Sequence, residues 1–315
     1  MRTLVATVGL VVLLGAAGPA HASFPGRNGG IAFAEFSASG DFDAQSFESS
    51  GIGFAPQPIG TETHPRDLVR CERTDGVVSG GNCTTTSYRS PSYSPNGKRI
   101  VFDAGERLGA IGAGGAGLYL LAPVTADDGE PCFSPDGKSI AFTGANDHGG
   151  TDLYTRRVAG GEARLIVHDA DQPAWSSRNR IAYVRSGDVY TSNPNGGKRR
   201  HVGAGVSPDW SPNGRRLVLI RPSGTGTSDG ILGRIYIVDA DGDNLRPLGR
   251  RRDASRPVWS PDGRWLAFDK FDSGVFARRL GSRKPALIVA ESQFSGENGS
   301  NSYFEPTWRP LLLDH

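Results

Sequence analysis

The chain has 315 residues, with 35 Lys and Arg against 33 Asp and Glu, which leaves a formal net charge of +2. Such a balanced composition argues against a dedicated nucleic-acid-binding surface. The length suits one large all-β domain with an extensive core.

The N-terminal residues are typical of a secretory signal peptide. Arg2 precedes an apolar run at 4–17, and Ala20-His21-Ala22 supplies a small-x-small cleavage site. The run is too short for a membrane-spanning helix, and no later stretch approaches membrane length. We expect removal of residues 1–22 and a mature chain, 23–315, that is secreted or lies in the periplasm or cell envelope without a transmembrane segment.

A hairpin motif recurs along the chain at intervals of about forty residues, which is the period of one β-propeller blade. Its consensus is Pro-x-aromatic-Ser-Pro-Asp/Asn-Gly-Lys/Arg-x-Ile/Leu-Ala/Val-Phe. Full copies occupy 91–102, 131–142 and 257–268, and degraded copies occupy 173–183 and 208–219. Pro presets φ and the Asp-Gly or Asn-Gly pair supplies positive φ, so each copy predicts a β-hairpin. A lone hairpin cannot bury its apolar face, and these hairpins therefore need neighbours.

Weaker strand patterns follow the hairpins, and four antiparallel strands make one propeller blade. One aromatic residue per copy, such as Trp210 or Trp259, is expected to pack between blades. The predicted third strands are 118–121, 152–155, 188–191, 234–238 and 275–277, and short fourth strands are predicted at 163–166, 199–202 and 286–289.

The two ends of the chain carry complementary halves of the repeat. Residues 28–33 contain the turn and second strand, whereas 305–310 contain a first strand alone. Pairing them would complete one blade and remove two exposed sheet edges. We predict an all-β, six-bladed β-propeller closed by pairing of the C-terminal strand with the N-terminal hairpin. A seventh blade would need an unrecognised unit in 36–89, and we interpret about 37–89 as the rest of the first blade with an insertion.

Three cysteines are present. Cys71 and Cys83 flank a Gly-rich turn in the insertion, and in an oxidising compartment this arrangement predicts a disulfide. Cys132 occupies the variable position of a first strand and is expected to be a buried free thiol.

The repeated hairpin, the Asp-x-Tyr third strands and the Asp-Ala-Asp-Gly turn at 239–242 resemble the TolB-type, WD40-like propeller repeat from residue 24 to 310. The resemblance implies an exported scaffold that binds proteins. The same repeat also builds the non-catalytic propeller of prolyl-oligopeptidase-like enzymes. TolB carries an N-terminal α/β domain, whereas here the repeat begins just after the signal peptide. We therefore expect a stand-alone propeller outside the Tol-Pal machinery.

Catalytic and metal-binding motifs are weak or missing in the sequence. It contains no His-Glu-x-x-His motif and no paired Cys-x-x-Cys motif. Asp239, Asp241 and Asp243 stand at alternate positions, as in a calcium loop, but Asn244 replaces its glycine and Arg250 its bidentate Glu. A polar turn is the simpler interpretation, and we predict no catalytic residues and no cofactor other than that weak calcium candidate.

Polar residues stand beside the repeat Pro, or in its variable slot, in several first strands. They either form a ring around one mouth of the channel that grips a peptide or an ion, or they are solvent-facing rim residues. Basic clusters at 198–201, 250–252 and 283–284 are either ordinary outer-strand charge or contacts to an anionic envelope partner. The channel-mouth candidates are Glu130, Gln172, Asp209, Arg256 and Glu305.

The combined prediction is an exported, monomeric, non-catalytic scaffold that binds a protein or peptide, without nucleic acid, at the channel mouth and the first-blade insertion. The alternative is a metal-dependent hydrolase or lactonase with a divalent ion in the central channel. A stoichiometric bound metal would favour that enzyme.

Overall fold

The computed structural model describes residues 24, 27–39, 47–55, 66–74, 77–79, 88–227, 230–250, 252–270, 273–290, 292–293 and 299–311. The predicted signal peptide, 1–22, lies outside these residues. The described residues form strands, turns and irregular segments, and they include no helix that could cross a membrane.

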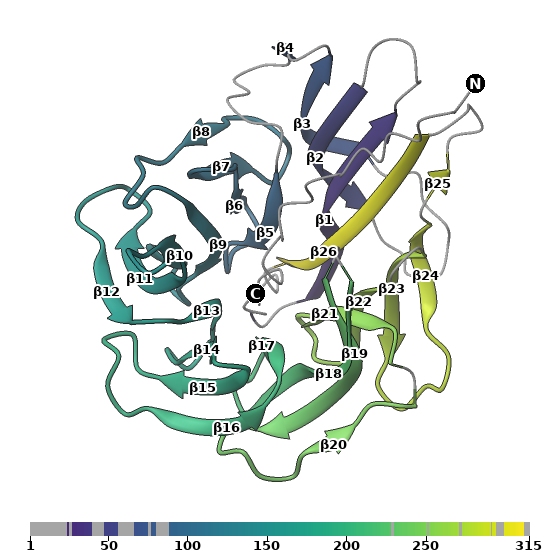
Figure 1. Ribbon diagram of the computed structural model, residues 1–315. Helices are drawn as coiled ribbons and strands as arrows, with labels where there is room; N and C mark the ends of the chain where they lie inside the picture. Colours follow the sequence, from purple (N-terminus) through teal and green to yellow (C-terminus); the bar gives the residue numbers. More distant parts are fainter. Residues whose placement is uncertain are drawn as a thin grey trace, which may run out of the picture.

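Antiparallel sheets lie in a propeller-like ring in Figure 1, with β5, β9, β13, β17 and β21 close to its centre. Three sheets have four strands each. They are β5 (Arg89–Tyr93), β6 (Arg99–Asp103), β7 (Leu108–Gly112) and β8 (Tyr119–Leu120); β9 (Asp128–Phe133), β10 (Ser139–Ala145), β11 (Thr151–Arg157) and β12 (Arg164–Val167); and β13 (Asp171–Trp175), β14 (Ile181–Arg185), β15 (Asp188–Ser192) and β16 (Arg200–Ala204).

Two larger sheets complete the arrangement. One follows the order β17 (Val206–Trp210), β18 (Arg216–Thr227), β19 (Gly230–Asp239), β21 (Ala254–Trp259), β22 (Trp265–Lys270), β23 (Gly274–Arg279) and β24 (Ala286–Ala290), with β20 (Arg246–Pro247) beside β19. Only Gly233 and Ala254 pair between β19 and β21. The other follows the order β25 (Ser292–Gln293), β26 (Gly299–Leu311), β1 (Arg27–Ser39), β2 (Phe47–Ala55), β3 (Arg66–Thr74) and β4 (Val77–Ser79).

The two ends of the described chain meet in that second sheet. β26 pairs with β1 in antiparallel register, with Ile31 opposite Trp308 and Ala32 opposite Thr307. β2 and β3 continue the sheet outward from within the segment interpreted as an insertion. The innermost strands also contact one another in the order β5, β9, β13, β17, β21, β26 and back to β5.

The residue types of the hairpin motif are explained by hydrogen bonds that its side chains make within its own turn. Ser134 Oγ donates to Asp136 Oδ1 at 2.6 Å, and the Lys138 N–H donates to the same oxygen at 3.0 Å. The Ser134 hydrogen bond, together with the amide of Lys138, holds the pKa of Asp136 below its usual value. Gly137 takes φ +68°, which L side chains rarely adopt. Ser260 and Asp262 repeat the contact at 2.6 Å.

Large side chains fill the space between neighbouring sheets. Trp210 and Trp259 are almost completely buried, as predicted for residues that pack between blades. Trp210 Nε1 also donates to the carbonyl oxygen of Ala174 in the preceding sheet at 3.1 Å. Burial of aromatic rings at this repeat position therefore joins one sheet to the next.

One predicted third strand is wrong. Residues 118–121 were expected to be the third strand of their sheet, but β7 takes that place and β8, Tyr119–Leu120, is the fourth strand. β7 has the sequence Leu-Gly-Ala-Ile-Gly, which lacks the large alternating residues typical of a strand. Gly109 is needed there because a Cβ would lie 2.6 Å from the ring of Phe102.

Candidate functional site

The innermost strands share an unusual backbone feature immediately before the repeat Pro. Five non-glycine residues at this position have left-handed φ values between 46° and 60°. Each lies where the pairing to the second strand shifts register, at a β-bulge. They are Ser90, Glu130, Gln172, Ser207 and Arg256. The face at which these strands begin is called the bulge face, and the opposite face, with the Ser-Pro-Asp/Asn-Gly turns, is called the turn face.

Left-handed backbone costs a non-glycine residue about 1 kcal/mol or more. Hydrogen bonds between successive sheets offset that cost. Glu130 Oε2 accepts from the backbone N–H of Gln172 at 2.7 Å, and Gln172 Oε1 accepts from the backbone N–H of Ser207 at 2.6 Å. At Glu130 and Gln172 the bulge thus aims the side chain at the next sheet.

The predicted channel-mouth residues lie along these innermost strands, and four of the five have described side chains. Glu130, Gln172, Asp209 and Arg256 are only 8%, 2%, 0% and 7% exposed, so they are not the solvent-facing rim residues of the simpler interpretation. Glu305 lies in β26, and its side chain is outside the described part of the chain.

Asp209 and Arg256 are held by different contacts from Glu130 and Gln172. Asp209 Oδ2 accepts from the backbone N–H of Trp259 in the next innermost strand at 2.7 Å. Arg256 Nη1 lies 3.6 Å from Asp269 Oδ2, and Ser255 Oγ donates to the same oxygen. The structure therefore places Asp209 inside the ring and Arg256 in a buried ion pair on the bulge face.

Further ionisable groups gather at the bulge face. Lys270 Nζ lies 3.9 Å from Asp253 Oδ2 and 4.4 Å from the centre of the Phe276 ring. Asp171 precedes Gln172, and its Oδ1 is buried without a hydrogen-bond partner. Burial raises the pKa of Asp171 to about 6. The innermost strands thus begin among charges of both signs.

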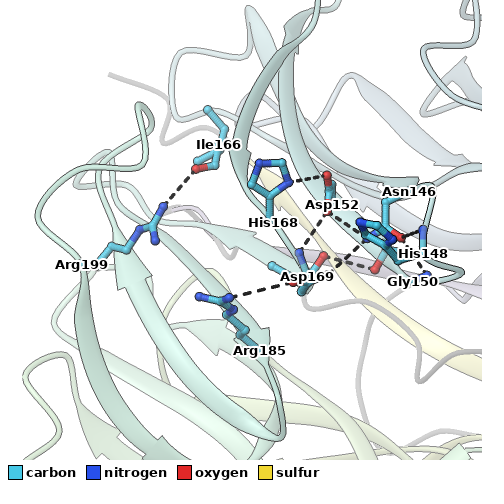
Figure 2. Close-up of polar contacts among 11 residues, drawn as sticks. Asn146, His148, Gly150, Asp152, Ile166, His168, Asp169, Arg185 and Arg199 are labelled. Atoms are coloured by element: carbon cyan, nitrogen blue, oxygen red, sulfur yellow. Dashed lines mark hydrogen bonds and ion pairs between the residues drawn. The ribbon is translucent and has the colours of Figure 1, made fainter.

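A second polar group lies on the same face, in the sheet of β9 to β12. Figure 2 shows Asp152 near its centre, with His168 Nδ1 2.9 Å from Asp152 Oδ2 and Asn146 Nδ2 3.0 Å from Oδ1. The backbone N–H of Asp169 also donates to Oδ1, at 3.0 Å. Burial alone would raise the pKa of Asp152, but these hydrogen bonds hold it below its usual value.

These contacts tie the loop between β10 and β11 to the connection between β12 and β13. His168 has a side chain that is 70% exposed, whereas that of Asp152 is 7% exposed. A cavity of about 430 Å³ lies beside the pair. Arg185 Nη2 is 4.0 Å from Asp169 Oδ2 at its edge. The group fixes this part of the rim through a buried carboxylate.

The weak calcium candidates form a polar turn between β19 and β20. Asn244 Nδ2 donates to Asp239 Oδ2 at 2.7 Å, and the Asp243 N–H donates to Asp241 Oδ1 at 3.2 Å. Within the described ranges, no three His, Cys, Asp or Glu residues are arranged to hold a metal ion. The carboxylates of Asp239 and Asp241 and the backbone of Asp243 thus take part in the hydrogen bonds of the turn, and calcium binding there stays a weak prediction.

The cysteine predictions have different outcomes. Cys132 is a buried free thiol, as expected, and burial raises its pKa well above the usual range. Cys71 lies in β3, but Cys83 is outside the described residues, so their disulfide stays a prediction.

Comparison with known proteins agrees with this architecture. No protein-family model matches the chain. The TolB structure from Acinetobacter baumannii superposes with a TM-score of 0.61 and 16% identity, covering 90% of this chain and 67% of that one. A putative TolB from Agrobacterium tumefaciens gives 0.58 and 17%, covering 87% and 99%. The chain has a TolB-like propeller fold.

Two sequence relatives are matched over less than a third of their own lengths. The Tol-Pal system protein TolB of Gluconobacter oxydans is 36% identical over 98 residues, which are 28% of this chain and 22% of that protein. An uncharacterized peptidase of Bacillus subtilis, YuxL, is 23% identical over 205 residues, which are 58% of this chain and 29% of the peptidase.

Among solved structures, an oligogalacturonate lyase in complex with manganese superposes with a TM-score of 0.53 and 12% identity, covering 87% of this TolB-like chain and 89% of the lyase.

Sequence reasoning missed part of the bulge-face set. Ser90 and Ser207 precede the repeat Pro as Glu130 and Gln172 do, and aligning the copies on that Pro would have revealed them. Asp171 and the Asp152–His168 pair have no repeat signal, since their positions depend on the folded connections between sheets.

Proposed function

We propose that the chain is an exported, non-catalytic, six-bladed propeller that binds a protein or peptide partner at its bulge face. The six-blade count is supported by the circular contacts of the innermost strands, from β5 through β26. Closure is supported by the antiparallel register of β26 with β1, which gives each of these end strands a partner.

One observation carries the proposal of a binding face: strained backbone and ionisable side chains coincide where the innermost strands begin. Strain of this kind clusters at functional sites because the surrounding structure must maintain it. Asp171 adds a half-buried residue with one buried carboxylate oxygen, Oδ1, that no hydrogen bond within the described structure satisfies. A partner that supplies a donor, such as a peptide N–H or a basic side chain, would satisfy it.

The proposed cellular setting is supported by the TolB-like fold and by the predicted signal peptide. TolB-like propellers serve as protein-binding scaffolds, and the predicted signal peptide would place this one in the periplasm or outside the cell. We propose a monomer there, whose partner meets the bulge face and the outer strands β2 and β3.

The test compares capture of envelope proteins by three forms of the immobilised chain. Asp171→Asn with Asp253→Asn alters the bulge face, whereas Asp241→Asn with Asp243→Asn alters the exposed turn after β19. We expect a partner retained by the parent and the turn variant to be lost from the bulge-face variant, although all three forms still unfold cooperatively on heating. Equal retention by all three forms would reject the bulge face as the binding site.

The enzyme alternative is supported by two similarities, to the manganese-bound lyase and to the peptidase. It requires a divalent ion in the central channel. Metal analysis of protein purified without chelators separates the two functions: a stoichiometric ion that persists through dialysis would favour the hydrolase or lactonase, and its loss on dialysis would favour the scaffold.

A further inference from the structure

We propose that a second surface, on the turn face at the junction of the β9–β12 and β13–β16 sheets, binds an acidic polypeptide segment. Its defining feature is an accumulation of guanidinium groups, here named the arginine surface. The residues of the arginine surface are Arg157, Arg164, Arg178, Arg180, Lys198, Arg199 and Arg200.

The arginine surface carries positive charge that no carboxylate of the described residues neutralises within ion-pair distance. Six of its seven residues are exposed and Arg180 is half-buried. Across the described part of the chain, the ion pairs within 4.0 Å involve other residues, namely the pairs of His168, Arg185, His201, Arg256 and Lys270. The two nearby carboxylates, Asp136 and Glu162, are not paired with these cations either.

The members of this surface are close in space although they come from two sheets. Arg199 Nη2 reaches across to the carbonyl oxygen of Ile166 in β12 at 3.5 Å, a contact visible in Figure 2. Arg180 Nη2 donates to the carbonyl oxygen of Lys198 at 3.2 Å. Burial lowers the pKa of Arg180, and repulsion by the nearby charge of Arg200 lowers it further. An anionic partner would relieve that repulsion.

Several guanidinium groups are already held in position by the protein. Arg178 Nε donates to the carbonyl oxygen of Asn213 at 2.7 Å, and Arg199 Nε donates to that of Gly196 at 3.1 Å. Arg180 Nη2 donates to Thr191 Oγ1 at 2.8 Å. Each group keeps further N–H donors, so a carboxylate can bind without much additional loss of side-chain freedom.

A cavity of about 570 Å³ between the two sheets adjoins the arginine surface, and its lining indicates which kind of anionic chain could bind there. Arg157 and Arg164 share its wall with Asp136 and Glu162. The two carboxylates would repel a uniformly anionic polymer but leave room for a polypeptide whose acidic residues alternate with neutral ones. Pro135 and Pro194 offer apolar contacts to such a chain. This surface lies opposite the bulge face, so either proposal can fail without the other.

The experiment measures binding of a fluorescein-labelled peptide of alternating Glu and Gly residues by anisotropy at low ionic strength. The variant Arg157→Gln, Arg164→Gln and Arg200→Gln removes three exposed charges that make no side-chain hydrogen bonds within the described structure. We expect the dissociation constant to rise about tenfold or more. The matched control, Arg246→Gln, Arg283→Gln and Lys284→Gln, removes three exposed charges elsewhere and should change it by less than about twofold.

Two further arms make the outcome decisive. Replacing the same three arginines by Lys keeps the charge, so at least part of the affinity should return, and melting curves should match the parent. Absence of peptide binding to the parent, or an equal loss in the control variant, would overturn the proposal. So would tighter binding of a DNA duplex of matched charge, because the surface would then select phosphate polymers.

Discussion

The hydrogen bond from Ser207 to Gln172 provides a direct test of how the bulges join neighbouring sheets. Gln172 Oε1 accepts from the Ser207 N–H at 2.6 Å, and the two residues are 2% and 3% exposed. Gln172→Ala would leave that N–H buried without its acceptor, which costs about 1 to 3 kcal/mol. Because alanine still has a Cβ, the strain at φ 53° would remain.

Gln172→Gly separates the lost hydrogen bond from the strain. Glycine loses the same acceptor but tolerates the left-handed backbone, so it should be more stable than the alanine variant by about 1 kcal/mol. Urea unfolding at equilibrium measures both values, and the exposed Glu162→Ala is the control, with an expected change within about 0.5 kcal/mol. We call the two successive hydrogen bonds to Glu130 and Gln172 from the following innermost strands the relay. An alanine variant as stable as the parent, or a glycine variant less stable than the alanine variant, would refute the role of Gln172 in this relay.

Three other perturbations test the fold and its charges. Trp259→Ala should cost about 3 to 5 kcal/mol, because its ring is fully buried between sheets, and a loss below about 1 kcal/mol in urea unfolding would contradict that role. Deleting everything after Ser302 removes Trp308 and most of the pairing to β1, so melting should occur at lower temperature with aggregation; an unchanged, monomeric protein would reject closure through β26. Burial raises the pKa of Asp171 from 3.8 to about 6, so the folded state binds its proton more tightly than the unfolded state and stability falls as pH rises between those values. Asp171→Asn should remove that fall and stabilise the protein by at most about 3 kcal/mol near pH 7, and a pH profile that stays unchanged in the variant would show that another group titrates.

The hairpins were predictable because each copy encodes its own turn chemistry. Ser134, Asp136 and Gly137 specify the turn locally, and each full copy repeats these residues with either Asp or Asn at the second of the three positions. β7 was not predictable from the sequence. Residue 109 must be glycine because the ring of Phe102 occupies the space that a Cβ would need, and that contact exists only in the folded sheet. Alternation identifies strands whose side chains face a core, but it fails where packing requires glycine.

The candidate site was predictable in position but not in environment. Alignment on the repeat Pro places Glu130 and Gln172 at one level of successive sheets, yet polar residues at strand starts are usually exposed. Their burial arises from the bulge, which turns each side chain toward the next sheet instead of the solvent. Only the three-dimensional register between β9, β13 and β17 reveals that Glu130 and Gln172 act in series.

This relay has a consequence for how a partner would be recognised. Because Glu130 and Gln172 each bond the following innermost strand, the spacing of these strands is fixed before any partner arrives. The bulge face therefore cannot adapt by opening one strand at a time, since that would leave a buried amide without its acceptor. A preformed site spends little binding energy on ordering itself, so affinity depends on how well a partner matches its fixed charges. Adaptable contacts are left to connections outside both the relay and the Asp152 group, and selectivity among related partners should change most readily there.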